Sequence, residues 1–204
     1  MMPSNEQPII EWGWAGAPVE GDESGDLHFV ALAPGAALVA LIDGLGHGPE
    51  AALAAREAAA ILDAEPMLPV RELIERCHQG LHKTRGVVMS IVSLHAQSST
   101  IEWCGVGNVE GILLRAPASA SPSEAIGTRG GVVGFRLPPL HVSSVPISPL
   151  DVLVLATDGI RSGFSDVIDL DFEPQQIADT VLARCAKGSD DALVLVARYL
   201  GEAP

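Results

Sequence analysis

The chain has 204 residues, 48% of them apolar, which fits one globular domain with a buried core. Its 26 aspartates and glutamates outnumber 12 lysines and arginines, giving a formal net charge of -14. Such an acidic surface repels nucleic-acid phosphates and anionic lipids, so we expect neither a nucleic acid nor a membrane as a partner.

The sequence carries no recognisable targeting segment. Residues 1–6 do not form a signal peptide, and charges interrupt each apolar run well before membrane-spanning length. The three cysteines are far apart and match neither a zinc-site spacing nor a disulfide framework. We therefore expect a cytoplasmic protein with a single domain over residues 1–204.

Hydrophobic periodicity predicts a mixture of strands and helices. Strands are expected at residues 9–14, 27–32, 37–42, 87–95, 100–105, 111–115, 136–142, 152–157 and 192–200. Helices are expected at residues 49–62, 70–84 and 173–186. The polar stretch 116–124 is expected to form a loose loop. This order indicates one mixed α+β domain, with strands before and after two central helices.

Two carboxylates are expected to meet at one sheet end. Asp26 precedes the strand at 27–32, and Asp43 follows the strand at 37–42. The short Pro34-Gly35 turn predicts a hairpin, which places both aspartates at the end remote from the turn. Asp43 also opens a glycine-rich turn, where a carboxylate beside bare carbonyls suits a hard divalent cation.

Further aspartates repeat this placement at strand ends. Asp158-Gly159 follows the apolar run 152–157, and Asp190-Asp191 precedes the last predicted strand. Asp-Gly also terminates strands for purely local reasons. Four acidic sites at strand ends nevertheless favour a shared metal site over that simpler interpretation.

Other catalytic patterns compete poorly. The sequence contains no Gly-x-Ser-x-Gly elbow, Walker A loop, His-Glu-x-x-His pair or Rossmann glycine fingerprint. His78 and His82 share helical spacing, but zinc would need a third ligand, so a solvated helix face is expected. His47 lies in the glycine turn, where it either tunes a metal, contacts phosphate or makes a local hydrogen bond.

Four stretches in order resemble the signatures of the PPM (2C-type) metal-dependent protein phosphatases, in particular their bacterial SpoIIE-like branch. They are Ser24-Gly25-Asp26, Asp43–Gly48, Ala156–Gly159 and Asp190–Leu193. The intervening stretches 74–79, 83–86 and 104–109 resemble small phosphatases of that branch that act on stressosome proteins.

The resemblance implies a four-layer αββα sandwich, in which two antiparallel sheets carry helices on their outer faces. The segment between Asp158 and Glu173 is short, so we expect a minimal form of this fold without a flap subdomain.

The resemblance also implies two Mn²⁺ or Mg²⁺ ions at one end of the sheets. Asp43 would bridge both ions, and the Gly44 carbonyl would bind one of them. Asp158 and Asp190 would complete the shell of the other ion, with Asp191 as the alternative to Asp190. Asp26 would bind directly or through water.

The implied activity is hydrolysis of phosphoserine or phosphothreonine by a metal-activated water, which makes Asp43, Asp158 and Asp190 the catalytic candidates. The implied substrates are phosphorylated STAS-domain stressosome proteins of the RsbS and RsbR type, so the enzyme would restrain stress signalling. No basic residue near the first strand can clasp phosphate, which leaves Arg129 and Arg161 as candidates. The alternatives are a catalytically weak binding module that sequesters a signalling partner, and a small-molecule phosphatase.

Overall fold

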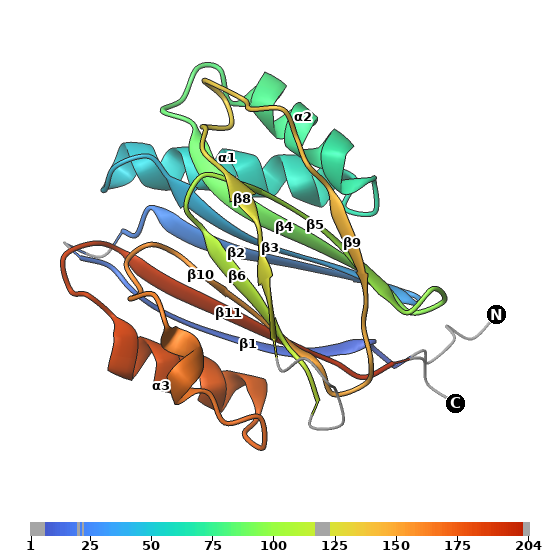
Figure 1. Ribbon diagram of the computed structural model, residues 1–204. Coiled ribbons are helices and arrows are strands. Elements are labelled where there is room, and N and C mark those ends of the chain that lie inside the picture. Colours follow the sequence, from blue (N-terminus) through green and yellow to red (C-terminus); the bar gives the residue numbers. More distant parts are fainter. Residues whose placement is uncertain (1–6, 20, 22, 117–122, 202–204) are drawn as a thin grey trace.

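The computed structural model describes residues 7–19, 21, 23–116 and 123–201. Two sheets lie face to face, with helices α1 and α2 over one of them and α3 over the other (Figure 1). This arrangement is the αββα sandwich expected from the sequence. Within the described residues, no helix combines the length and apolar character needed to cross a bilayer.

The first sheet has the strand order β1-β11-β10-β6-β7, and all its pairings are antiparallel. Its strands are β1 (Ile10–Ala17), β6 (Glu110–Leu114), β7 (Ser123–Ile126), β10 (Val152–Ala156) and β11 (Ala192–Tyr199). Strands β10 and β11 are buried along their whole length because helix α3 covers one face and the second sheet covers the other. Their sequences are therefore continuous apolar runs, apart from Arg198 near the end of β11, and do not alternate between apolar and polar residues.

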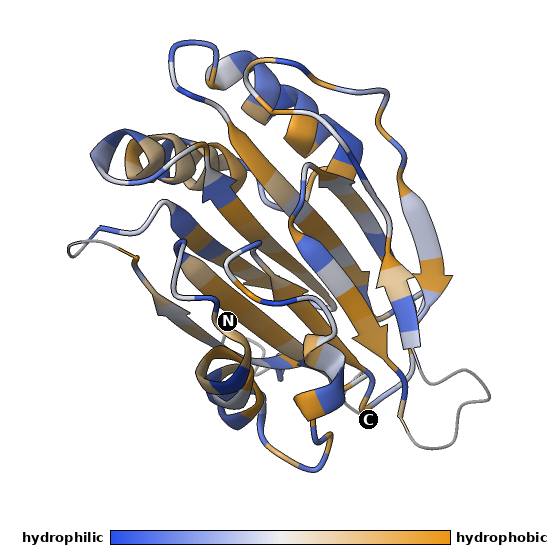
Figure 2. Ribbon diagram, turned by 60° about the vertical axis from the view of Figure 1, so that its left-hand side comes forward, coloured by the Kyte–Doolittle hydropathy of each residue, from blue (hydrophilic) through white to orange (hydrophobic). Residues whose placement is uncertain are grey.

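The second sheet has the order β2-β3-β4-β5-β8, with β9 also paired to β5. Its strands are β2 (Asp26–Ala33), β3 (Ala36–Gly44), β4 (Val87–His95), β5 (Thr100–Val106), β8 (Thr128–Arg129) and β9 (Ser143–Pro146). Only the short β5–β8 pairing is parallel among the described strands. The strands of both sheets are predominantly hydrophobic, which provides the apolar layer between them (Figure 2).

The helices complete the outer layers. They are α1 (Pro49–Ala64), α2 (Val70–Gly80), α3 (Pro174–Cys185) and the short 3-10 helix η1 (Phe164–Val167). Helix α1 begins with proline at its first turn, where the missing N–H costs nothing. Its buried face consists mainly of alanines, so its backbone lies close to the second sheet.

One predicted strand is wrong. Arg136 makes only an isolated bridge to Val132, residues 137–142 have no strand pairing, and the strand forms just after them, as β9 at Ser143–Pro146. Pro138 and Pro139 explain the difference because proline has no N–H to donate to a sheet.

The other differences concern boundaries. Helix α2 ends at Gly80 rather than residue 84, and a turn closed by the Thr84 N–H on the Leu81 carbonyl follows it. The short elements β7, β8 and η1 were not predicted. Of the loop expected at 116–124, residues 117–122 lie outside the described part of the chain, and Ser123 and Glu124 belong to β7.

Candidate metal centre

Asp26 and Asp43 lie directly opposite one another in the antiparallel pairing of β2 and β3. The hairpin turn at the other end contains Gly35, which adopts a positive φ of 67°. The convergence of these two carboxylates, predicted from the length of the hairpin, is confirmed.

Asp43, Asp158 and Asp190 line one open pocket of about 320 Å³. Asp43 ends β3, Asp158 follows β10, and Asp190 precedes β11, so both sheets contribute to the pocket. The remaining lining residues are Leu45, Gly46, His47, Val88, Asn108 and Val132. The structure thus brings three of the four predicted aspartate ligands to a single cavity.

Asp26 lies beside this pocket but outside its lining. Its side chain is buried, and its Oδ2 accepts a 2.7 Å hydrogen bond from the Thr157 hydroxyl. Its backbone N–H donates to the Ser24 hydroxyl over 3.1 Å. Asp26 therefore lies next to Asp43 in the sheet, with its carboxylate held by Thr157.

Asp190 and Asp191 occupy different environments. Asp190 is exposed and faces the pocket. Asp191 is buried, and its two carboxylate oxygens accept the backbone N–H groups of Val19 at 2.7 Å and Gly25 at 2.6 Å. Both oxygens of Asp191 are thus engaged in holding the loop between β1 and β2. This geometry favours Asp190 as the ligand of the pair.

The glycines of the two Asp-Gly motifs serve close packing. A Cβ on Gly44 would lie 2.1 Å from the carbonyl oxygen of Ala51, and one on Gly159 would lie 1.9 Å from that of Asp191. Each motif therefore places its aspartate at a strand end and lets a second backbone segment pass against it. Gly46 and Gly48, in contrast, have positive φ values of 87° and 77° in the turn itself.

Burial and mutual repulsion perturb the carboxylates strongly. Burial, followed by the charges of Asp26, Asp158 and Asp190, raises the pKa of Asp43 to about 8. Burial raises the pKa of Asp26 to about 7 despite the opposing hydrogen bond from Thr157. Burial and the charge of Asp190 also raise the pKa of Asp158. Such a cluster of like charges needs either protons or a bound cation to offset its repulsion.

Several neighbours of the pocket were not assigned a role from the sequence. Asn108 Nδ2 donates to Asp158 Oδ2 over 2.7 Å, and the Lys187 ammonium donates to the Asp158 carbonyl. The Arg85 guanidinium lies against Gly46 and pairs with Glu50 at the start of α1. Asn108 and Arg85 belong to the stretches 104–109 and 83–86 already singled out by resemblance, whereas no pattern in the sequence pointed to Lys187.

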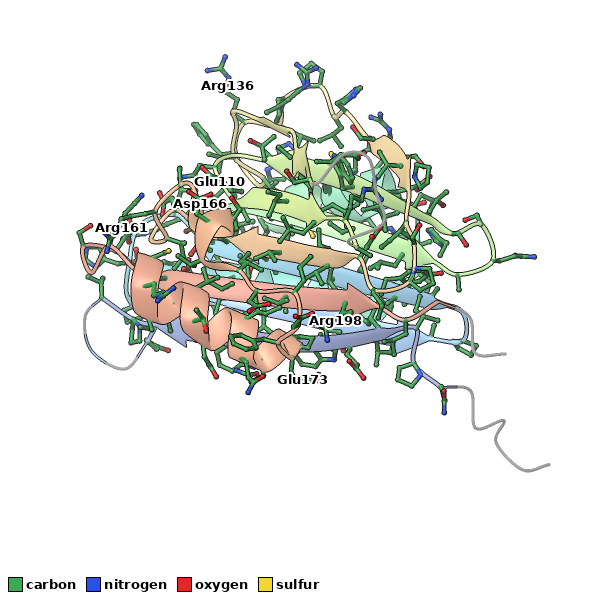
Figure 3. The ribbon with its side chains drawn as sticks, turned by 60° about the horizontal axis from the view of Figure 1, so that its bottom comes forward. Glu110, Arg136, Arg161, Asp166, Glu173 and Arg198 are labelled. Carbon is green, nitrogen blue, oxygen red and sulfur yellow. The ribbon has the colours of Figure 1, made fainter. Side chains whose placement is uncertain are left out.

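The residues considered for phosphate or zinc binding have other positions. Neither Arg129 nor Arg161 lines the pocket, and the Arg161 side chain donates to the Ala186 carbonyl at one end of the fold (Figure 3). His47 lines the pocket and is exposed. His78 and His82 are not simply a solvated helix face, because both hydrogen-bond the backbone of Gly134.

The donor set fits a hard divalent cation. Carboxylates and a backbone carbonyl are the ligands that Mg²⁺ and Mn²⁺ prefer. Among the described residues, no three acidic, histidine or cysteine side chains already stand close enough to enclose an ion. A bound Mg²⁺ commonly keeps several waters and takes only one or two carboxylates from the protein, which is compatible with this spacing.

The overall structure is that of the PPM (2C-type) phosphatases. It matches RsbX in complex with magnesium with a TM-score of 0.83 and 19% identity, covering 97% of this chain and 98% of that one. It matches the PP2C phosphatase domain of SpoIIE from Bacillus subtilis with a TM-score of 0.80 and 22% identity, covering 98% of this chain and 66% of that one. A structure from work on the bacterial stressosome as a modular system adapted to control secondary messenger signaling gives a TM-score of 0.85 and 25% identity, with coverages of 93% and 99%.

The sequence comparison defines the family. The model of the family "Stage II sporulation protein E (SpoIIE)" matches residues 33–200, so the chain belongs to that family. Phosphoserine phosphatase RsbX of Bacillus subtilis (strain 168) is 33% identical over 100 residues. That alignment spans 48% of this chain and 48% of RsbX, about half the length of each.

Proposed function

We propose that this protein is a metal-dependent serine/threonine phosphoprotein phosphatase that acts on phosphorylated STAS-domain stressosome proteins of the RsbS and RsbR type. The observation that carries the proposal is the convergence of Asp43, Asp158 and Asp190 on one pocket between the sheet ends. The relationship to the phosphoserine phosphatase RsbX and the structural match from stressosome work support the substrate class. A cytoplasmic location stays a prediction.

We propose Asp43, Asp158, Asp190 and the Gly44 carbonyl as the groups that hold two Mn²⁺ or Mg²⁺ ions, with Asp26 reaching them directly or through water. When bound, such ions lower the pKa of water and neutralise phosphoryl charge. The magnesium complex of RsbX, which shares the fold, supports this choice of metal.

The chain's own residues would orient the reactants. Asn108 fixes the Asp158 carboxylate through its 2.7 Å hydrogen bond, and Thr157 fixes Asp26. The Lys187 ammonium and the Arg85 guanidinium are cations beside the carboxylate-lined pocket, where they would attract a phosphomonoester dianion. His47, exposed on the pocket wall, would be the candidate to exchange a proton with the leaving hydroxyl.

The alternative, a catalytically weak module that sequesters a partner, uses the same fold. It gives no reason to retain a cluster of carboxylates in which burial, followed by mutual repulsion, raises the pKa of Asp43 to about 8. A small-molecule phosphatase would have the same metal site, and substrate comparison separates it from a protein phosphatase.

The decisive experiment measures phosphate release from a phosphorylated STAS-domain protein and from free phosphoserine, with and without Mn²⁺. Wild-type protein should release phosphate from the phosphoprotein only with the metal, and Asp43→Asn should abolish this release. Calorimetry should show that Asp43→Asn also loses Mn²⁺ binding. Faster release from free phosphoserine would favour the small-molecule enzyme. Tight binding of the phosphoprotein without release under any metal would favour the binding module.

A further inference from the structure

The turn at residues 132–136 presents an aromatic side chain to solvent beside the candidate metal centre. Phe135 is 82% exposed, more than any other large hydrophobic residue in the described part of the chain. Val132, at the base of the same turn, lines the carboxylate pocket. We call residues 132–136 the Phe135 turn.

The Phe135 turn is held rigidly at its base. Val132 and Arg136 exchange backbone hydrogen bonds of 2.9 and 2.8 Å, and the Phe135 N–H donates to the Val132 carbonyl. Val133 is fully buried and exchanges two 2.9 Å hydrogen bonds with Val87 at the start of β4. The exposed phenyl group is therefore carried by an ordered backbone.

Two histidines, one in α2 and one just after it, hydrogen-bond the tip of this turn. The Gly134 N–H donates to His78 Nδ1 over 3.0 Å, and His82 Nδ1 donates to the Gly134 carbonyl over 3.0 Å. Gly134 has a φ of 96°, and a Cβ there would lie 2.8 Å from Leu81 Cβ. Because this conformation is fixed before any partner arrives, docking on Phe135 would cost little ordering entropy.

The Phe135 turn is also connected to the glycine turn that carries Asp43. Gly86, next to Val87, accepts a 3.1 Å hydrogen bond from the Leu45 N–H. Arg85 lies against Gly46 and pairs with Glu50. A molecule bound to the Phe135 turn would thus contact backbone that is connected by hydrogen bonds to the turn carrying Asp43.

The segments that form the Phe135 turn and its surroundings differ in charge from the rest of the chain. The protein has a formal charge of -14, yet the sequence contains no carboxylate between Glu75 and Glu102 or between Glu124 and Asp151. These two segments supply the α2 end, the Phe135 turn and the cations Lys83, Arg85, Arg129 and Arg136.

Carboxylates adjoin the Phe135 turn at the pocket that Val132 lines, and Glu50 pairs with Arg85. Figure 3 shows Arg136 projecting away from the fold. Lys83, Arg129 and Arg136 are exposed, so they would attract acidic groups on the surface of a docking protein.

We propose that the Phe135 turn is the docking element for the phosphoprotein substrate, with Phe135 contacting an apolar residue and Arg136 an acidic residue beside the phosphorylated site. This inference rests on the proposed function, because it specifies the substrate of that same centre as a protein with an acidic surface around its phosphoresidue. An exposed aromatic residue next to an arginine is typical of the few residues that dominate a protein interface.

The test compares two substrates with Mn²⁺ present: a phosphorylated STAS-domain protein and para-nitrophenyl phosphate. Phe135→Ala and Arg136→Glu should each lower kcat/KM for the phosphoprotein at least tenfold, mainly by raising KM. Both variants should leave hydrolysis of para-nitrophenyl phosphate within twofold of wild type. Phe172→Ala and Arg184→Glu are matched controls, because both residues are exposed next to or on α3, and both should behave as wild type.

Equal losses on both substrates would overturn docking by this turn, since the change would then act on the metal centre itself. Unchanged kinetics on the phosphoprotein would also overturn it while leaving the phosphatase assignment intact. A concentration-dependent dimer that Phe135→Ala converts to a monomer, without a change in KM, would assign the turn to self-association instead. Absence of activity in the wild type on both substrates would overturn the proposed function and this inference together.

Discussion

The Thr157 hydroxyl donates a 2.7 Å hydrogen bond to the buried carboxylate of Asp26 and thereby joins the two sheets at the metal end. Thr157 follows β10 in the first sheet, and Asp26 opens β2 in the second. The same Thr157 oxygen accepts the Leu193 N–H over 2.9 Å. One hydroxyl therefore fixes a candidate ligand and the spacing between the sheets.

Replacing Thr157 by valine should weaken both stability and metal binding. Valine keeps the shape but leaves a buried carboxylate oxygen and the Leu193 N–H without their partner, which costs about 1–3 kcal/mol. Thermal unfolding should show a lower Tm, and calorimetric titration with Mn²⁺ should show weaker binding. Thr157→Ser is the control, because it retains the hydroxyl. Equal Tm and Mn²⁺ affinity in Thr157→Val and wild type would contradict a role for this bond.

The adjacent residues Asp190 and Asp191 should respond to substitution in opposite ways. Asp190→Asn should weaken Mn²⁺ binding without lowering the Tm of the metal-free protein, since asparagine keeps the Oδ1 that accepts the Asp191 N–H and removes a repelling charge. Asp191→Ala should lower the Tm of the metal-free protein, because it leaves the buried N–H of Gly25 and the N–H of Val19 without an acceptor. The expected cost is about 2–4 kcal/mol for the two bonds together.

Melting curves of the metal-free proteins and Mn²⁺ titrations distinguish the two roles. If Asp191→Ala kept the wild-type Tm but lost Mn²⁺ affinity, Asp191 would be the ligand.

The positions of the aspartates follow from local signals in the sequence. Asp26 and Asp43 were predicted to meet because a two-strand hairpin with a short turn leaves little freedom in register. Asp158 was found because a fully apolar run such as 152–157 can only be a buried strand or helix segment, and Asp-Gly ends it. The hydrophobic periodicity and the turn-forming residues were sufficient to predict where these three aspartates lie.

The supporting residues were missed because their roles depend on contacts between distant parts of the chain. Arg85 reaches the glycine turn, and His78 and His82 reach Gly134, only after α2 and the Phe135 turn have packed together. The wrong strand at 136–142 has a local cause, since Pro138 and Pro139 were present in the sequence and argue against pairing.

The metal-free protein should lose stability as the pH rises from about 5 to 8. The pKa of Asp43 is raised from 3.8 to about 8, and that of Asp26 to about 7, so the folded state holds protons that the unfolded chain has already released. In this range the unfolded state binds fewer protons, and the free energy of unfolding therefore falls with pH. At about 1.4 kcal/mol per pH unit for each group and about 2–4 °C per kcal/mol for a chain of this size, the drop in Tm should be on the order of 10–20 °C.

A variant and a metal titration test whether the carboxylates cause this fall of Tm with pH. Asp43→Asn should flatten the decline of Tm with pH, because it removes the group with the pKa of about 8. Saturating Mn²⁺ should reverse the decline, because a cation replaces the protons and binds better as they leave. A metal-free Tm that rises between pH 5 and 8 would show that these carboxylates are not crowded in solution.

The glycines of the Asp-Gly motifs should tolerate no side chain. In Gly44→Ala the new Cβ would meet the Ala51 carbonyl oxygen at 2.1 Å, and in Gly159→Ala it would meet that of Asp191 at 1.9 Å. Both neighbours are backbone atoms and cannot rotate away, so each change should cost about 3 kcal/mol or more. Gly127→Ala is the matched control, since nothing lies within 4 Å of its Cβ position and its φ is not positive. Chemical denaturation should place Gly127→Ala near wild type and both motif variants far below it, and because each clash displaces a candidate ligand, Mn²⁺ affinity should fall with stability. Wild-type denaturation midpoints in Gly44→Ala or Gly159→Ala would mean that the backbone contacts beside the metal centre are looser than their geometry indicates.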